Sequence, residues 1–97
     1  GDQITVETLA ERCAGYDAVL VPWESAAPKP LRESLPRLIE GARSIAVVVG
    51  PEGGFAHAEV ERLQVAGAHP ISLGPRILRT ETAAMALVAT INYLTDD

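Results

Sequence analysis

The sequence predicts an α/β fold in which helices flank a parallel sheet. Short apolar segments at 18–21, 45–49 and 71–73 have the composition of strands. Longer segments with helical spacing of apolar side chains lie between them. The strand segments are apolar throughout, which is typical of strands covered on both faces, as in parallel sheets. A chain of 97 residues without repeats or linkers is expected to form one domain.

The first helix is expected between residue 5 and residue 15. Thr5 is the predicted N-cap, and Gly15 is expected to end the helix. The following strand, 18–21, ends at Pro22, and Trp23 is expected to pack at the sheet rim, with base stacking as the alternative. The apolar stripe of this helix, at i, i+3, i+4 and i+7, consists of Val6, Leu9, Ala10 and Cys13.

The second helix contains a proline in the middle of its apolar stripe. Pro36 lies between Leu35 and Leu38 and is expected to kink or split the helix, which should end at Gly41. The segment 45–49 is the clearest strand, because it is β-branched and uncharged, and Gly50 follows it directly.

Two further helices complete the pattern. One is expected after Gly54, with Val60, Leu63 and Ala66 on its buried face and Gly67 at its end. A strand at 71–73 follows, and Thr80 can cap the last helix. The expected buried stripe of that last helix is Ala84, Leu87, Val88, Ile91 and Leu94.

Charge and cysteine content limit the classes of function. Eight basic and thirteen acidic residues give a net charge of −5, which disfavours this segment as a self-sufficient nucleic-acid-binding surface. A single cysteine, Cys13, is expected to be buried, and it favours a reducing, cytoplasmic location. No apolar run is long enough to cross a membrane. Because Gly1 stands in place of an initiator Met, we expect a piece of a longer protein.

Two glycine-containing turns follow strands directly and precede helices. These turns, 50–54 and 74–79, are expected at one edge of the sheet, beyond the carboxyl ends of the strands, where ligands of parallel sheets bind. Gly50, Gly53 and Gly54 allow positive φ and close approach of a ligand to the backbone. Neither a Walker phosphate loop nor a dinucleotide fingerprint occurs there. A tight connection that binds no ligand is the alternative.

The second turn carries the one locally basic spot of the chain. Arg76 and Arg79 have no acidic neighbour before Glu81. These side chains either contact an RNA phosphate or base edge, or they are solvated arginines with a structural role. His57 and His69 have no third ligand nearby, so we expect no metal site.

The two turns together resemble a known family. "VVVGPEGGF" followed by "ISLGPRILRTETA" is similar to the C-terminal part of the RsmE family, the ribosomal RNA uridine-N3 methyltransferases of the SPOUT superfamily. The similarity covers residues 45–91, and both motifs are intact. It implies a trefoil-knotted methyltransferase domain, of which residues 1–97 would be the C-terminal portion. The N-terminal RNA-binding domain and the start of the catalytic domain would then be absent.

The resemblance also implies a cofactor, partners and site residues. The cofactor would be S-adenosylmethionine, held largely by backbone atoms, and the enzyme would be a cytoplasmic homodimer that acts on the small ribosomal subunit. Arg79 is the candidate catalytic residue that stabilises the uracil anion, and Arg76 is the candidate substrate contact. The cofactor-binding positions that match the family motifs are Gly50, Glu52, Gly53, Gly54, Leu73, Gly74, Ile77, Leu78 and Arg79.

Two alternatives to this function remain open from the sequence. The first is methylation of another RNA, such as transfer RNA, because substrate choice would reside largely in the absent domain. The second is a non-catalytic dimerisation module, built on the alanine-rich last helix. Binding of S-adenosylmethionine distinguishes this second alternative from an enzyme.

Overall fold

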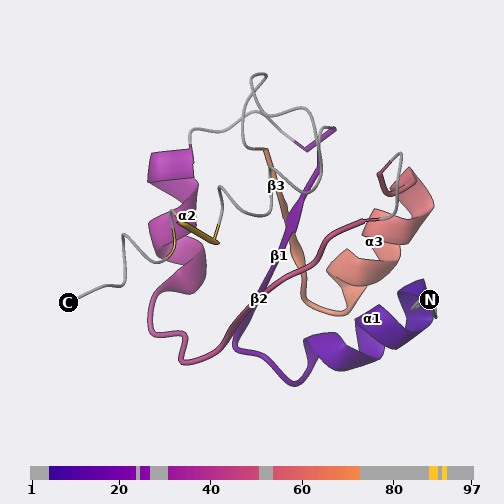
Figure 1. Cartoon of the computed structure of the whole chain (residues 1–97), viewed down its shortest axis with the longest axis horizontal. Helices are drawn as coiled ribbons and strands as arrows, with labels where there is room; N and C mark the ends of the chain where they lie inside the picture. Colours follow the sequence, from indigo (N-terminus) through magenta and orange to yellow (C-terminus); the bar gives the residue numbers. More distant parts are fainter. Residues whose placement is uncertain are drawn as a thin grey trace.

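The computed structural model describes residues 5–23, 25–26, 31–50, 54–72, 88–89 and 91. Within them a parallel sheet lies between helices, which confirms the predicted α/β class (Figure 1). The elements in chain order are α1 (Val6–Cys13), β1 (Ala18–Pro22), α2 (Leu31–Ile39), β2 (Ile45–Val47), α3 (His57–Val65) and β3 (His69–Ile71).

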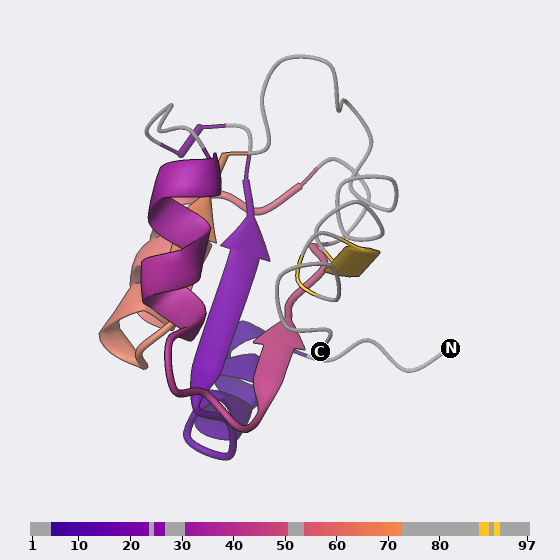
Figure 2. The ribbon, with the colours of Figure 1, turned by 90° about the vertical axis from the view of Figure 1, so that its left-hand side faces the viewer.

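The sheet has three strands in the order β2-β1-β3, and β1 is therefore the central strand. Both neighbours run parallel to β1, with Ala18 opposite Ile45 on one side and Leu20 opposite His69 on the other. Figure 2 shows the arrows of β1 and β2 pointing the same way, with α2 packed beside them. Because all three strands are parallel, their carboxyl ends lie at one edge of the sheet.

Side chains of β1 enter a separate core on each face of the sheet, and every residue of the strand is buried. Val19 and Val21 belong to the core beneath α1 and α3, whereas Leu20 packs with Leu35 of α2 on the opposite face. This alternation is the pleat of a strand with both faces covered. The prediction of a doubly covered strand from its apolar composition is confirmed.

The ends of the helices follow the sequence signals at most positions. The Thr5 hydroxyl accepts the backbone N–H of Thr8 at 3.2 Å, as predicted for the N-cap of α1. Gly41 and Gly67 have φ of 72° and 104°, the left-handed conformation that ends α2 and α3. Gly15 does not adopt a positive φ, so α1 ends without a left-handed glycine.

Polar contacts tie the helices and the amino ends of the strands together. The Asp17 carboxylate accepts the backbone N–H groups of Arg43 at 2.7 Å and Ser44 at 3.3 Å, which joins the entry of β1 to that of β2. Arg62 of α3 pairs with Glu7 of α1, with its Nη2 3.1 Å from the carboxylate. Both side chains of this ion pair are largely exposed, so its contribution to stability is modest.

Several sequence-based expectations need correction. The second strand covers 45–47 instead of 45–49. The predicted split of α2 at Pro36 is wrong: the helix runs unbroken from residue 31 to residue 39, because Pro36 is on the exposed side while Leu35 and Ile39 are buried. The third strand covers 69–71 instead of 71–73, since these residues pair with 20–22 of β1. Val88 was expected in the buried stripe but is 44% exposed.

The predicted burial of Ile91 is confirmed, at 7% exposure. The other members of that stripe, at 84, 87 and 94, lie outside the described residues. Among the helices that the structure describes, none is long and apolar enough to cross a membrane.

Candidate functional site

The strands that lead to the two glycine-containing turns end at the same edge of the sheet. The first turn leaves β2 and the second leaves β3, and both strands run parallel to the central strand β1. The strands that lead to the turns therefore end at the same edge of the sheet, as the sequence predicted, and β1 separates them. Residues 51–53 and 73–80, which complete the turns, lie outside the described residues.

At this edge of the sheet, the connections that follow β1 and β2 lead to opposite faces of the sheet. After β1 it continues to α2, which packs on the face of Leu20, and after β2 it continues to α3, which packs on the face of Val19. Figure 1 shows α2 on one side of the sheet and α3 on the other. Connections that diverge beyond adjacent carboxyl ends create the crevice in which ligands of open α/β sheets bind. This position is occupied here by the first glycine turn.

Gly50 has a packing role that its sequence context did not reveal. A Cβ at this position would lie 3.0 Å from Cδ2 and 3.1 Å from Cε2 of the Phe55 ring. The ring is buried in the core beneath α1 and α3. Because φ at residue 50 is not positive, the backbone does not demand glycine there, and the close approach of the aromatic ring is what disfavours a side chain.

Gly54 adopts a positive φ, which the sequence analysis expected for this turn. Its φ is +83°, and a Cβ there would meet no described atom within 4 Å. The residue is glycine because of its conformation, and no described neighbour crowds its Cβ position. The two described glycines of the turn therefore serve different purposes, one for packing and one for chain direction.

The exit of the first turn is held by an aromatic residue from the central strand. The Nε1–H group of Trp23 donates to the Phe55 carbonyl oxygen at 3.1 Å. The Trp23 ring also meets His57 edge to face, with 4.8 Å between ring centroids and an interplanar angle of 77°. Trp23 is half-buried against the core. The expected packing of Trp23 at the rim is confirmed.

Glu59 fixes the start of the helix that follows this turn. Its carboxylate accepts the backbone N–H of Ala56 at 2.8 Å, which satisfies a donor at the N-terminus of α3. A negative side chain is also favourable in the first turn of a helix. Residues 54–59 therefore form a well-supported exit from the turn.

Two of the predicted site residues belong to the described part of the chain. Of the predicted cofactor-binding positions, Gly50 and Gly54 are described and lie at the expected edge. The remaining ones, together with the candidate catalytic and substrate residues, lie outside the described residues: Glu52, Gly53, Leu73, Gly74, Arg76, Ile77, Leu78 and Arg79. Their roles stay predictions.

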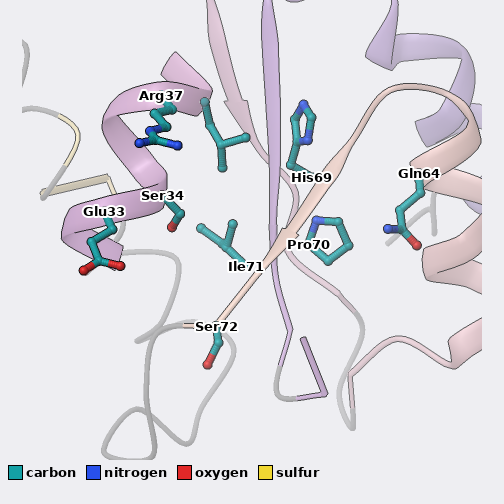
Figure 3. A pocket seen from close by; sticks show the side chains of 9 residues that line it. Glu33, Ser34, Arg37, Gln64, His69, Pro70, Ile71 and Ser72 are labelled. Atoms are coloured by element: carbon teal, nitrogen blue, oxygen red, sulfur yellow. The ribbon is translucent and has the colours of Figure 1, made fainter. Parts of the chain in front are cut away.

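A groove of about 740 Å³ runs between α2 and the outer edge of β3. Figure 3 shows Glu33 and Arg37 on the α2 wall, and His69, Pro70 and Ile71 along β3, with Ile71 directed toward α2. Ser72, the last described residue before the second turn, lines one end of the groove, and Gln64, Ser34 and Leu38 complete the lining. The charges of the α2 wall cancel, so the groove has no net preference for an anion.

The cysteine and both histidines of the chain lie outside the two turns. Cys13 is a buried free thiol, and desolvation raises its pKa, as expected for a cysteine that packs as a small apolar residue. His57 and His69 lie on α3 and β3, and no group of three metal-ligating side chains occurs among the described residues.

Sequence reasoning missed Phe55 as a functional support. The sequence signal was an aromatic residue directly after the glycine turn, in a segment that contains no other aromatic residue. Its role depends on contacts with Trp23 and Gly50, and the contact with Trp23 spans 32 positions of the chain. Local spacing carries no information on such a contact.

Comparison with known proteins places the chain in a family. The sequence profile described as an RNA methyltransferase domain matches residues 2–92. The chain is 35% identical to ribosomal RNA small subunit methyltransferase E of Bacillus subtilis over 98% of its own length, and 39% identical to the protein of that name from Mycobacterium tuberculosis over 93%. It spans 38% and 33% of the lengths of these two relatives.

Solved structures agree with this placement. A crystal structure of a hypothetical protein matches 99% of the chain at a TM-score of 0.75 and 34% identity, and the match covers 39% of that protein. A Legionella pneumophila protein described as a methyltransferase, solved with the bound cofactor SAM, matches 89% of the chain at a TM-score of 0.64 and 30% identity, over 34% of its own length. The match between profile and sequence runs through both glycine turns and all three strands, and on this ground the chain belongs to the RNA methyltransferase domain family.

Proposed function

We propose that this chain is the cofactor-binding part of an S-adenosylmethionine-dependent RNA methyltransferase, and that the whole enzyme methylates N3 of a uridine in small-subunit ribosomal RNA. The observation that carries the proposal is the sheet order: β2 and β3 flank β1, so both glycine motifs begin at one edge. The names of the relatives and the SAM bound in the Legionella structure support it.

The described ends of the turns fit such a cofactor. Gly54 has a φ of +83° with no described neighbour at its Cβ position, and the buried Phe55 ring closes the space beneath Gly50. Backbone N–H and C=O groups on an apolar support suit recognition of a nucleoside, whose specificity comes from a few fixed polar groups. The cofactor's sulfonium is cationic and requires no anion-binding residues, so the acidic Glu52 in the motif is compatible with it.

The proposed residue roles follow the family motifs. Gly50, Glu52, Gly53 and Gly54 would hold the cofactor from the first turn. From the second turn, the cofactor would be held by Leu73, Gly74, Ile77, Leu78 and Arg79. When bound, the cofactor supplies an electrophilic methyl group.

The two arginines of the second turn would act on the RNA. The guanidinium of Arg79 would stabilise the anion formed when the uracil N3–H loses its proton. Arg76 would contact the RNA backbone, since a guanidinium pairs with a phosphate through two hydrogen bonds. In-line placement of the two reactants would supply much of the rate.

The assembly and setting of the enzyme belong to the same proposal. The enzyme would be a cytoplasmic homodimer that acts on the small ribosomal subunit, mainly through an RNA-binding region beyond residues 1–97. The second turn and the last helix would form the trefoil knot of the SPOUT fold.

Calorimetric titration with S-adenosylmethionine tests the cofactor assignment. We expect binding to the chain, with the Legionella relative as a positive control. Gly53→Val should reduce the affinity about tenfold or more, because a branched side chain blocks approach to the turn backbone. Ala14→Val is the matched control, since Ala14 is an exposed residue with ordinary helical φ at the end of α1, away from the turns. Absence of binding at ~1 mM ligand would contradict the proposal.

Deletion of the coding sequence in its host tests the RNA substrate. We expect loss of N3-methyluridine from small-subunit ribosomal RNA, measured by nuclease digestion and mass spectrometry of the nucleosides. Loss of a methyl group from transfer RNA, with ribosomal RNA unchanged, would instead establish the alternative substrate. Unchanged nucleosides in both RNAs would contradict an enzymatic role.

A further inference from the structure

Trp23, at the end of the central strand, contacts two distant segments of the chain. Its side chain contacts the exit of the first turn, and its backbone contacts β3, the strand that leads to the second turn. The backbone N–H of Trp23 donates to the Ile71 carbonyl oxygen at 2.9 Å, one residue before Ser72 and three before the second turn. Its indole N–H donates to the Phe55 carbonyl oxygen at 3.1 Å, one residue after Gly54. Trp23 therefore bridges the two chain segments that hold the glycine motifs.

The indole bond satisfies a group that has no partner in the helix. Phe55 precedes the N-cap residue Ala56, so its carbonyl lies outside the hydrogen-bond ladder of α3. The residue is buried, and a buried carbonyl without a partner costs free energy. The indole of Trp is a large apolar ring that also donates a hydrogen bond through its Nε1–H group. Phe has no donor, and the Tyr hydroxyl lies at the far end of a smaller ring, away from the position of the indole Nε1.

The Phe55 ring transmits this restraint to the start of the same turn. The ring lies 3.0 Å from the position that a Cβ of Gly50 would take, so a shift of Phe55 displaces the surface against which residue 50 packs. His57 contacts the Trp23 ring edge to face and holds the indole from the α3 side. Trp23, Phe55 and Gly50 thus form a continuous contact path from β1 to both ends of the first turn.

We infer that Trp23 is a positioning residue that sets the separation of the two cofactor turns. The inference rests on the proposed function, because it assigns a purpose to the distance between turns that would share one cofactor. Trp23 touches neither the methyl group nor the RNA in this account. It acts through Phe55 and Ile71, each of which lies next to a motif.

The first arm of the test needs no ligand. The backbone N–H of Ala56 is bonded to Glu59 and serves as the probe. In Trp23→Phe, hydrogen exchange at this amide should accelerate about three- to tenfold, because the variant lacks one hydrogen bond of ordinary net strength. The Ala18 amide, bonded to Ser44 at the amino end of the sheet, should keep its rate. Equal acceleration at both amides, or none at Ala56, would overturn the positioning role.

The second arm uses wild-type protein and therefore does not depend on a variant that folds. Trp23 is the single tryptophan of the chain, so its emission on excitation near 295 nm reports on this position alone. Titration with S-adenosylmethionine should change the emission and reduce quenching by acrylamide, with saturation at the calorimetric affinity. Unchanged emission at a ligand concentration that calorimetry shows to be saturating would overturn the inference.

The third arm measures affinity in matched variants. Trp23→Phe should weaken S-adenosylmethionine binding about three- to tenfold. Tyr16→Phe removes one polar group from an exposed aromatic at the opposite end of β1 and should leave the affinity unchanged. If wild type binds no cofactor, the proposed function fails, while the exchange arm still decides whether Trp23 restrains the turn. Equal affinity in wild type and Trp23→Phe would contradict the inference with the function intact.

Discussion

Glycines 50 and 54 are four positions apart in one turn, and different physical constraints select them. At Gly54 the constraint is the backbone, because φ of +83° is costly for any residue with a Cβ. At Gly50 the constraint is the Phe55 ring, which fills the position of a side chain. The shape of the turn therefore depends partly on backbone conformation and partly on the packing of the Phe55 ring against Gly50.

Gly50→Ala should destabilise the protein by about 1–3 kcal/mol, since the added methyl group overlaps a ring that the core holds in place. The double variant Gly50→Ala/Phe55→Leu should lose less than the sum of the single variants, because the smaller side chain leaves room for the methyl group. Urea denaturation of the four proteins measures this coupling. Strictly additive losses would show that the ring and residue 50 do not compete for space.

Pro36 of α2 and Pro70 of β3 show which local preferences packing overrides. Pro36 interrupts the hydrogen bonds of α2, yet the helix continues because Leu35 and Ile39 are buried against the sheet. Pro70 is tolerated in β3 for a different reason. Since Ile71 accepts the N–H of Trp23, the polar groups of residue 70 face away from β1, so the strand loses no bond to its neighbour.

Pro36→Ala should stabilise the protein by about 1–3 kcal/mol, because alanine restores an N–H to the helix interior and is exposed at this position. Pro70→Ala is the matched control and should change the free energy of unfolding by less than about 0.5 kcal/mol, since its new N–H would face away from the sheet. Thermal and urea denaturation provide the comparison. A gain at Pro70 equal to that at Pro36 would contradict this account of the strand.

Sequence periodicity was sufficient for the layered architecture but insufficient for the support of the site. The apolar strands predicted a covered parallel sheet, and parallel strands place their turns at one edge, so the position of Gly50 and Gly54 followed from the sequence. The role of Phe55 did not follow, because it depends on Trp23, 32 residues away. The third strand was misplaced by two residues, since its limits depend on pairing with β1. Such long-range contacts are absent from any local pattern.

The central claim is that the two glycine turns form one binding pocket at the carboxyl edge of the sheet. Titration of isotope-labelled chain with S-adenosylmethionine, followed by amide chemical shifts, tests it most directly. We predict simultaneous shifts at Gly50, Gly54, Ser72 and the Trp23 indole, with none at Asp17, which lies at the opposite edge. Shifts confined to one turn or centred on the amino edge would contradict the claim.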